Sequence, residues 1–251
     1  MSGGTRPSAA TLEALAWASD GVAVVVGAGG GIGAALCEQL AARLPDVPLV
    51  RMGRREAVPL DLLEDASLQS AREALARELD ATGRPLRLFI DATGFLHGNG
   101  WRPEKTWREL DRAHLMHQFA INAVGPALLM QQFLPLMPRQ GRAVWATLSA
   151  KVGSIGDNRL GGWYGYRAAK AALNQFVRTA AIELRRQSPQ AACVALHPGT
   201  VETALSAPFA RSGLQVKTPA QAAAGLLAVI DGLTDADSGG LFDHTGARLP
   251  W

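Results

Sequence analysis

The stretch from Val22 to Gly33 reads VAVVVGAGGGIG, and it decides the fold. Its first five residues are apolar and mostly β-branched, which is typical of a buried parallel strand. A glycine cluster follows from Gly27 to Gly33, and residues with helical spacing run on from Ala34 to Leu44. A strand, a glycine-rich turn and a helix in this order predict a dinucleotide-binding βαβ unit.

The glycines in this turn have separate physical roles. Gly27 permits a tight turn, Gly31 lets the backbone approach a pyrophosphate, and Gly33 allows the helix to pack closely. The free N–H groups at the start of the helix attract an anion. A glycine-rich stretch alone could be a flexible turn, but the flanking strand and helix favour a phosphate loop. We therefore expect Gly27, Gly31, Ile32 and Gly33 to contact a cofactor.

The alternation of strands and helices continues along the chain. Further strands are expected over Leu49 to Met52, Leu86 to Asp91, Ala143 to Ser149 and Ala192 to Leu196. Helices are expected over Thr11 to Ser19, Ala66 to Ala81, Arg112 to Leu136, Ala168 to Gln187 and Pro219 to Ile230. This order predicts an α/β fold: a single doubly wound Rossmann domain over residues 21–251, whose parallel sheet is flanked by helices on both faces. Residues 1–20 would form an N-terminal extension.

Composition excludes several other classes. Hydrophobic residues make up 48% of the chain and charged residues 19%, which argues against disorder. The formal charge of +3 is spread along the sequence, so no nucleic-acid partner is expected. Cys37 and Cys193 stand alone in apolar segments, so neither a disulfide framework nor a metal site is expected. Because we recognise no signal peptide and no membrane-spanning stretch, we expect a cytoplasmic protein without a membrane partner.

The end of the second strand bears on the choice of cofactor. NAD enzymes usually place an acidic residue there for the ribose 2′-hydroxyl, whereas this chain reads RMGRR from Arg51 to Arg55. A guanidinium fork matches a 2′-phosphate, so NADP(H) is favoured over NAD(H), with Arg54 as the better candidate. The alternative is that Arg54 and Arg55 are solvated loop charges.

Asp61 has two interpretations. It follows Pro59 and Leu60, where its carboxylate could lie near the adenine amino group of a cofactor. It could equally be the N-cap of the helical segment that begins near Glu64.

Tyr166 and Lys170 stand four residues apart at the start of an apolar helical segment, so one helical turn places them on the same face. A phenol has a pKa near ~10, and a neighbouring cation would favour its phenolate. Taken alone, such a pair is weak evidence for a catalytic site.

Together with the glycine loop, this Tyr-x-x-x-Lys pattern resembles the active-site motif of the short-chain dehydrogenase/reductase family. The order of the other motifs is similar too: Gly27-xxx-Gly31-x-Gly33, Asp91 to Gly94 in place of the family's Asn-Asn-Ala-Gly, Asn122, Ser149, and Pro198-Gly199-Thr200-Val201-Glu202-Thr203. The SAKVGS stretch from Ser149 and the terminal LPW are similar to the C-factor-like and sniffer-like carbonyl reductase branch.

The resemblance implies hydride transfer between NADP(H) and a small carbonyl or alcohol substrate. Tyr166 would be the general acid–base, and Ser149 would bind the substrate oxygen. Lys170 would lower the pKa of the tyrosine and bind the nicotinamide ribose, while Asn122 would support a water relay. The cofactor-binding set is then Gly27, Gly31, Ile32, Gly33, Arg54, Asp61, Asn122, Tyr166, Lys170, Pro198, Gly199, Val201 and Thr203.

Two further expectations concern the surroundings of the site. The segment from Ala204 to Thr218 would form a lid over the substrate pocket. The long helices after Arg112 and Ala168 could pair with a second subunit in a homo-oligomer, a dimer or tetramer, as is common in the family. Alternatively, their apolar faces are simply buried in the monomer.

The serine and the function both have rival interpretations. The family places its serine about a dozen residues before the tyrosine, but Ser149 lies 17 residues before Tyr166, and Ala150 follows where a second serine is common. Ser154, 12 residues before, is the rival; we favour Ser149 because it ends a strand. The alternative function is a non-catalytic NADP(H)-binding sensor or signalling protein, which would not need Tyr166 and Lys170.

Overall fold

One parallel sheet forms the centre of the molecule. The structure is a computed structural model, and it describes residues 15–98, 100–203 and 216–251. The sheet has the order β2-β1-β3-β4-β5-β6. Its strands are β1 (Val22–Val26), β2 (Leu49–Met52), β3 (Leu86–Asp91), β4 (Ala143–Leu148), β5 (Ala191–His197) and β6 (Leu241–Asp243). The strand order reverses between β1 and β3, and a doubly wound sheet binds ligands at the carboxyl ends of the strands beside such a point.

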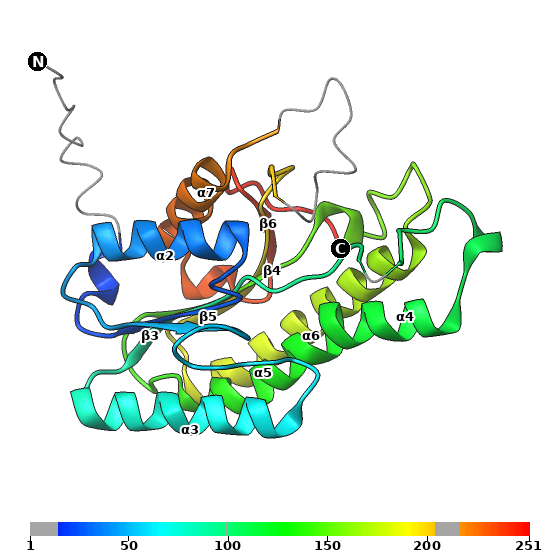
Figure 1. The fold of residues 1–251 in the computed structure, drawn as a ribbon. Helices are drawn as coiled ribbons and strands as arrows, with labels where there is room; N and C mark the ends of the chain where they lie inside the picture. Colours follow the sequence, from blue (N-terminus) through cyan, green and yellow to red (C-terminus); the bar gives the residue numbers. More distant parts are fainter. Residues whose placement is uncertain (1–14, 99, 204–215) are drawn as a thin grey trace, which may run out of the picture.

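Helices cover both faces of the sheet. They are α2 (Gly31–Arg43), α3 (Asp65–Thr82), α4 (Arg112–Phe119), α5 (Gly125–Phe133), α6 (Tyr164–Gln187) and α7 (Pro219–Gly232). Figure 1 shows α2 and α7 on one face and α3, α5 and α6 on the other. In β1, Ala23 and Val25 belong to the core beneath α2 and α7, while Val22, Val24 and Val26 belong to the opposite core. Because both faces are buried, the strand reads as an unbroken apolar stretch.

The predicted fold class and the expected strands are confirmed, with three differences. Helix α6 begins at Tyr164 and not at Ala168, so Tyr166 lies in its first turn. The helix expected from Arg112 to Leu136 contains a π-helical turn, η3 (Ala120–Val124), which includes Asn122. Strand β6 was not predicted, because a three-residue strand after two glycines carries no periodicity.

One stretch of the chain contradicts the expectation that no segment is long and apolar enough to cross a membrane. The stretch Arg112–Leu136 is long and apolar enough. In this fold, however, its α4, η3 and α5 pack against α6, and α5 also packs against α3. A core helix of a folded domain passes the same test, so the stretch is weak evidence for a membrane span.

The first described residues pack onto the domain. Leu15 and Ala18 are buried in the core beneath α2 and α7, around the short helix η1 (Ala16–Ala18). The backbone N–H of Leu15 and Nε1 of Trp17 both donate to Oδ1 of Asp231 on α7. The expected helix from Thr11 to Ser19 is thus seen as this short turn, and residues 1–14 lie outside the described residues.

Candidate active site

The glycine loop joins β1 to α2 as predicted. Gly27 has φ +77°, a conformation that side chains disfavour. Its N–H and that of Ala28 both donate to the carbonyl oxygen of Met52 at the end of β2. A Cβ on Gly33 would lie 2.1 Å from the carbonyl oxygen of Gly27, so only glycine fits there. Ile32 is partly buried, and its side chain packs on the core beneath α2.

The loop after β5 meets this glycine loop. A Cβ on Gly31 would lie 3.0 Å from Cγ2 of Thr203, which brings together two predicted cofactor contacts. Pro198 and Gly199 follow β5 directly, and Val201 forms a parallel bridge with Lys217 just before α7. Most of the lid proposed from Ala204 to Thr218 lies outside the described residues.

The arginines within and after β2 differ in their partners. Arg54 is exposed and makes no hydrogen bond or ion pair with the described residues. Arg51 instead forms an ion pair with Glu56, with 3.0 Å between its Nε and Oε2. The Glu56 side chain is only 14% exposed, and its Oε1 would lie 3.0 Å from a Cβ on Gly29. A carboxylate from the residue that follows Arg55 therefore lies beside the glycine loop.

Asp61 does not cap α3. Its Oδ1 accepts from the backbone N–H of Leu63, and its own N–H donates to Oγ of Ser67. The N-cap residue of α3 is Glu64. The N-cap alternative is therefore wrong, because the Asp61 carboxylate accepts from Leu63 in a turn that precedes that cap.

Tyr166 and Lys170 lie on one face of α6, both buried, with Nζ 5.9 Å from the centre of the tyrosine ring. Nζ donates a 2.7 Å hydrogen bond to the carbonyl oxygen of Leu148 at the end of β4. Burial raises the pKa of Tyr166 to about 12 and lowers the pKa of Lys170 to about 8. Desolvation is thus the dominant effect on the phenol in the protein alone, and the lowering of its pKa by Lys170 stays a prediction.

Asp91 is the buried counter-charge of this site. Its Oδ2 accepts from the Thr147 hydroxyl at 2.6 Å, and its Oδ1 accepts from the N–H and hydroxyl of Thr93. These bonds tie the end of β3 to β4 where the family has asparagine. The negative charge of Asp91 also opposes the lowering of the Lys170 pKa by burial.

Asn122 fixes the turn after β3. Its Oδ1 accepts from the N–H of Phe95 at 2.9 Å, and its Nδ2 donates to the Phe95 carbonyl at 2.7 Å. A Cβ on Gly94 would lie 3.6 Å from Oδ1 of Asn122 and 3.9 Å from Nζ of Lys170, so Asn122 is close to the lysine. A water relay through this side chain would compete with bonds that are already made.

Both candidate serines are buried and already hydrogen-bonded. Ser149 is buried, and its hydroxyl donates to Oδ1 of Asn174 at 2.7 Å. The hydroxyl of Ser154, also buried, accepts from the N–H of Asp157. Ala150, which lies between the two serines in sequence, packs with Leu96 and Tyr166 in a small apolar cluster.

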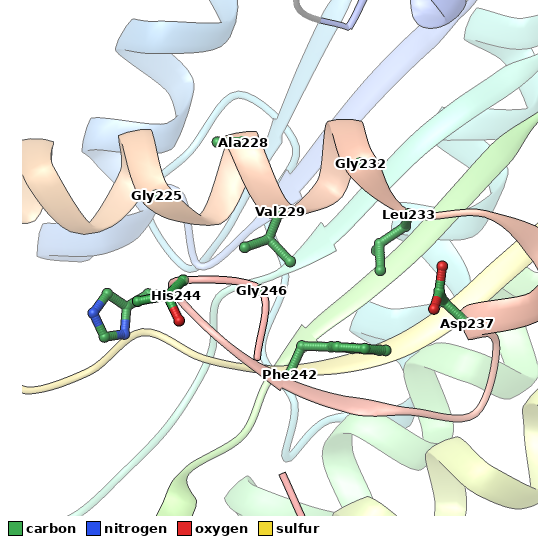
Figure 2. A pocket seen from close by; sticks show the side chains of 10 residues that line it. Gly225, Ala228, Val229, Gly232, Leu233, Asp237, Phe242, His244 and Gly246 are labelled. Atoms are coloured by element: carbon green, nitrogen blue, oxygen red, sulfur yellow. The ribbon is translucent and has the colours of Figure 1, made fainter. Parts of the chain in front are cut away.

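His197 ends β5 and lies near His244. Burial, with a smaller effect from His244, lowers the pKa of His197 to about 4, so it is neutral near pH 7. Figure 2 shows His244, Val229, Leu233 and Phe242 among the residues that line a hollow between α7 and the turn after β6. The volume of this hollow is about 360 Å³. None of the residues that line this hollow is a predicted site residue, so the hollow is separate from Tyr166 and Lys170.

Three features lie at the carboxyl edge of the sheet. They are the glycine loop, the Tyr166–Lys170 pair on the helix after β4, and Asn122, which is held by the backbone of Phe95. The sequence model described as short chain dehydrogenase matches residues 21–212. The chain belongs to this family. The order of elements that it shares with the family explains why local motifs far apart in sequence meet at one edge.

The similar proteins include members of the C-factor-like and sniffer-like branch that the sequence resembles. The chain is 37% identical over 143 residues to C-signal of Myxococcus xanthus, covering 57% of this chain and 82% of that protein. It is 35% identical to 1-hydroxy-2-glutathionyl-2-methyl-3-butene dehydrogenase of Rhodococcus sp., covering 74% and 78%. The crystal structure of NADPH-bound carbonyl reductase from chicken fatty liver superposes with TM-score 0.79 at 26% identity, covering 92% and 100%. The carbonyl reductase Sniffer of D. melanogaster, with TM-score 0.76 at 23% identity over 92% and 99%, shares the fold. These findings support an oxidoreductase and not the sensor alternative.

Proposed function

We propose that the protein is an NADP(H)-dependent carbonyl reductase that interconverts a small carbonyl compound and its alcohol. The observation that carries the proposal is the buried Tyr166–Lys170 pair, which lies on the helix after β4 at the ligand-binding edge of the sheet. The similarity to the NADPH-bound carbonyl reductase from chicken fatty liver supports the choice of cofactor and substrate class.

The residues present fit a phosphorylated dinucleotide. Gly33 allows the start of α2 to lie against the glycine loop, where free N–H groups attract a pyrophosphate. Arg54 is exposed and unpaired among the described residues, so its guanidinium can bind a 2′-phosphate. Gly31 and Thr203 would contact the cofactor where the two loops meet. When bound, NADPH supplies the hydride.

The other steps belong to the side chains of the chain itself. Tyr166 gives its phenolic proton to the substrate oxygen during reduction and recovers it from solvent afterwards. Lys170, held by the Leu148 carbonyl and opposite the charge of Asp91, stabilises the phenolate that remains. Ser149 is proposed to bind the substrate oxygen, and Asn122 keeps the backbone after β3 in place.

The test is oxidation of NADPH followed at 340 nm with a panel of aldehydes, ketones and quinones. We expect turnover with at least one carbonyl class, and no turnover when Tyr166 is replaced by Phe. A wild-type protein that binds NADPH and reduces none of these classes would contradict the proposal and return attention to a nucleotide-binding sensor.

We further propose that two copies pair through α5 and α6. Phe176 is exposed on α6, beside a hollow of about 390 Å³ between the two helices that also includes Met130 and Leu134. Light scattering on the wild type and on Phe176→Glu tests this, and a monomeric wild type would contradict it.

We also propose a cytoplasmic location, supported by the two buried free cysteines, since reducing compartments keep thiols free. Cell fractionation checks it.

A further inference from the structure

Four buried polar side chains form a connected path beside the catalytic helix. They are Glu104, His114, Gln118 and Asn122, with exposed fractions of 2%, 3%, 0% and 0%. The last three are spaced by four residues, so they follow one stripe along α4 and into η3. Of the four, only Asn122 belongs to the site described above. Buried polar groups need partners, so the contacts along this path determine one another.

The hydrogen positions along the path can be derived from the two hydrogen bonds between Asn122 and the backbone of Phe95. Phe95 fixes the Asn122 amide, because its N–H must meet Oδ1 and its carbonyl must meet Nδ2. Nδ2 of Asn122 then donates to Oε1 of Gln118 at 2.8 Å. Nε2 of Gln118 therefore faces the carbonyl of Leu96 at 3.2 Å and Nε2 of His114 at 3.1 Å.

His114 must follow this orientation. An amide Nε2 can only donate, so Nε2 of His114 is the unprotonated acceptor. The ring proton is then on Nδ1, which faces Oε1 of Glu104 across a long contact of 3.4 Å. This Oε1 has no hydrogen-bond partner that meets strict geometry among the described residues. The path therefore requires a neutral imidazole with Nδ1–H directed at a carboxylate.

The other oxygen of Glu104 acts on the catalytic helix. Its Oε2 accepts from the N–H of Gly165 at 3.2 Å, in the first turn of α6 and one residue before Tyr166. The N-cap residue of this helix, Trp163, provides no side-chain cap. A Cβ on Gly165 would lie 2.9 Å from Oε1 of Glu104, so glycine is what permits the close approach. A carboxylate at a helix N-terminus stabilises that end of the helix.

We propose that Glu104 is a positioning residue for the reductase reaction, holding the start of α6 directly and Asn122 through His114 and Gln118. The proposal rests on the proposed function. It links the helix that carries Tyr166 and Lys170 to the asparagine beside Lys170 through one carboxylate. Because Asn122 pins the backbone of Phe95, a change at Glu104 acts on both the start of α6 and the turn after β3 without touching substrate or cofactor.

Glu104→Gln tests the link with an isosteric side chain. The amide that replaces the carboxylate cannot accept from both Gly165 and His114, so one contact becomes donor against donor. We expect kcat to fall on the order of 10–100-fold, since small misplacements of catalytic groups cost this much, while the Kd for NADPH changes less than about twofold. Glu109→Gln, the same change at an exposed carboxylate of the same loop, should keep wild-type kcat.

The second readout does not depend on turnover. Long-range ¹H–¹⁵N spectra of histidine-labelled protein, with His114 assigned from His114→Gln, report which ring nitrogen carries the proton. We expect Nδ1–H in the wild type and a changed His114 signal in Glu104→Gln. A wild-type proton on Nε2 would overturn the inference even if the protein is an active reductase, and Nδ1–H would support the path even if no substrate is found.

A variant in the middle of the path covers the case in which Glu104→Gln does not fold. Gln118→Met keeps the bond from Glu104 to Gly165 and removes the link between His114 and Asn122. We expect a similar fall in kcat with unchanged NADPH affinity. Wild-type kcat in Gln118→Met would overturn the coupling.

Discussion

The hydroxyl of Ser149 donates a 2.7 Å hydrogen bond to Oδ1 of Asn174, which lies one turn beyond Lys170 on α6. Nδ2 of Asn174 is buried and has no partner among the described residues. Turning this amide by 180° would let Nδ2 donate to Ser149 and free the serine proton for a substrate oxygen. Ser149 can therefore bind a substrate oxygen as donor only after this exchange.

Ser149→Ala is expected to lower kcat by roughly 10²-fold, because one preorganised donor to a reacting oxygen contributes about this much. Ser154→Ala should stay near the wild-type value, and steady-state kinetics on a substrate of the native protein measures both. Ala150→Ser is the informative companion, since residue 150 lies in the cluster around Tyr166. If Ser149→Ala keeps wild-type kcat while Ala150→Ser raises it, the oxygen-binding position is 150 and not 149.

Tyr166→Phe should reduce kcat by about 10²–10⁴-fold, because it removes the proton that general acid catalysis requires and keeps the buried ring. Binding of NADPH, followed by fluorescence, should change little. Tyr164→Phe is the matched control, since Tyr164 lies in the same helical turn but is partly exposed. Wild-type kcat in Tyr166→Phe would refute the acid–base assignment.

The rate of reduction should fall as pH rises through about 8, because burial lowers the pKa of Lys170 to about 8 and the ammonium is then lost. Lys170→Arg keeps a cation, so this limb of the pH profile should move upward or vanish. Between about pH 8 and 10.5 the unfolded chain binds more protons at Lys170 than the folded chain, so this group makes the free energy of unfolding rise with pH. A limb near pH 8 that persists in the arginine variant belongs to another group.

Arg54→Asp should weaken NADPH binding more than NADH binding, since it replaces a phosphate-binding fork by a carboxylate. Arg55→Asp, at the neighbouring exposed arginine, should have the smaller effect. Glu56→Gln should act in the opposite direction, because it frees Arg51 and removes a negative charge beside Gly29. Titration of the four proteins with both cofactors measures this. A wild type that prefers NADH, or equal losses in the two arginine variants, would show that Arg54 does not select the phosphate.

Gly33→Ala should destabilise the protein by about 1–3 kcal/mol and abolish cofactor binding, because its Cβ would meet the Gly27 backbone. Gly232→Ala, at the end of α7 where a Cβ meets nothing within 4 Å, should be neutral or slightly stabilising. Urea denaturation of both variants compares them. Equal free energies of unfolding for the two variants would show that the glycine turn can adjust to a Cβ at residue 33.

The sequence determined the elements whose signals are local. An unbroken apolar strand, a glycine turn and a helix predict β1 and α2 because each depends on side-chain periodicity or on backbone freedom at single residues. The four-residue spacing of Tyr166 and Lys170 likewise places both on one helical face wherever the helix packs. Family resemblance then predicted which strand ends would meet.

Only the tertiary structure decided the contacts between distant residues. Glu56 lies beside the glycine loop because the chain turns back after β2, and Glu104 reaches Gly165 across 61 positions of sequence. Ser149 bonds to Asn174 while the neighbouring Ala150 packs with Tyr166, and both contacts depend on how β4 ends against α6. Such contacts follow from the packing of whole elements, since a polar side chain bonds to whatever partner the fold brings within about 3 Å, and no local pattern records that partner.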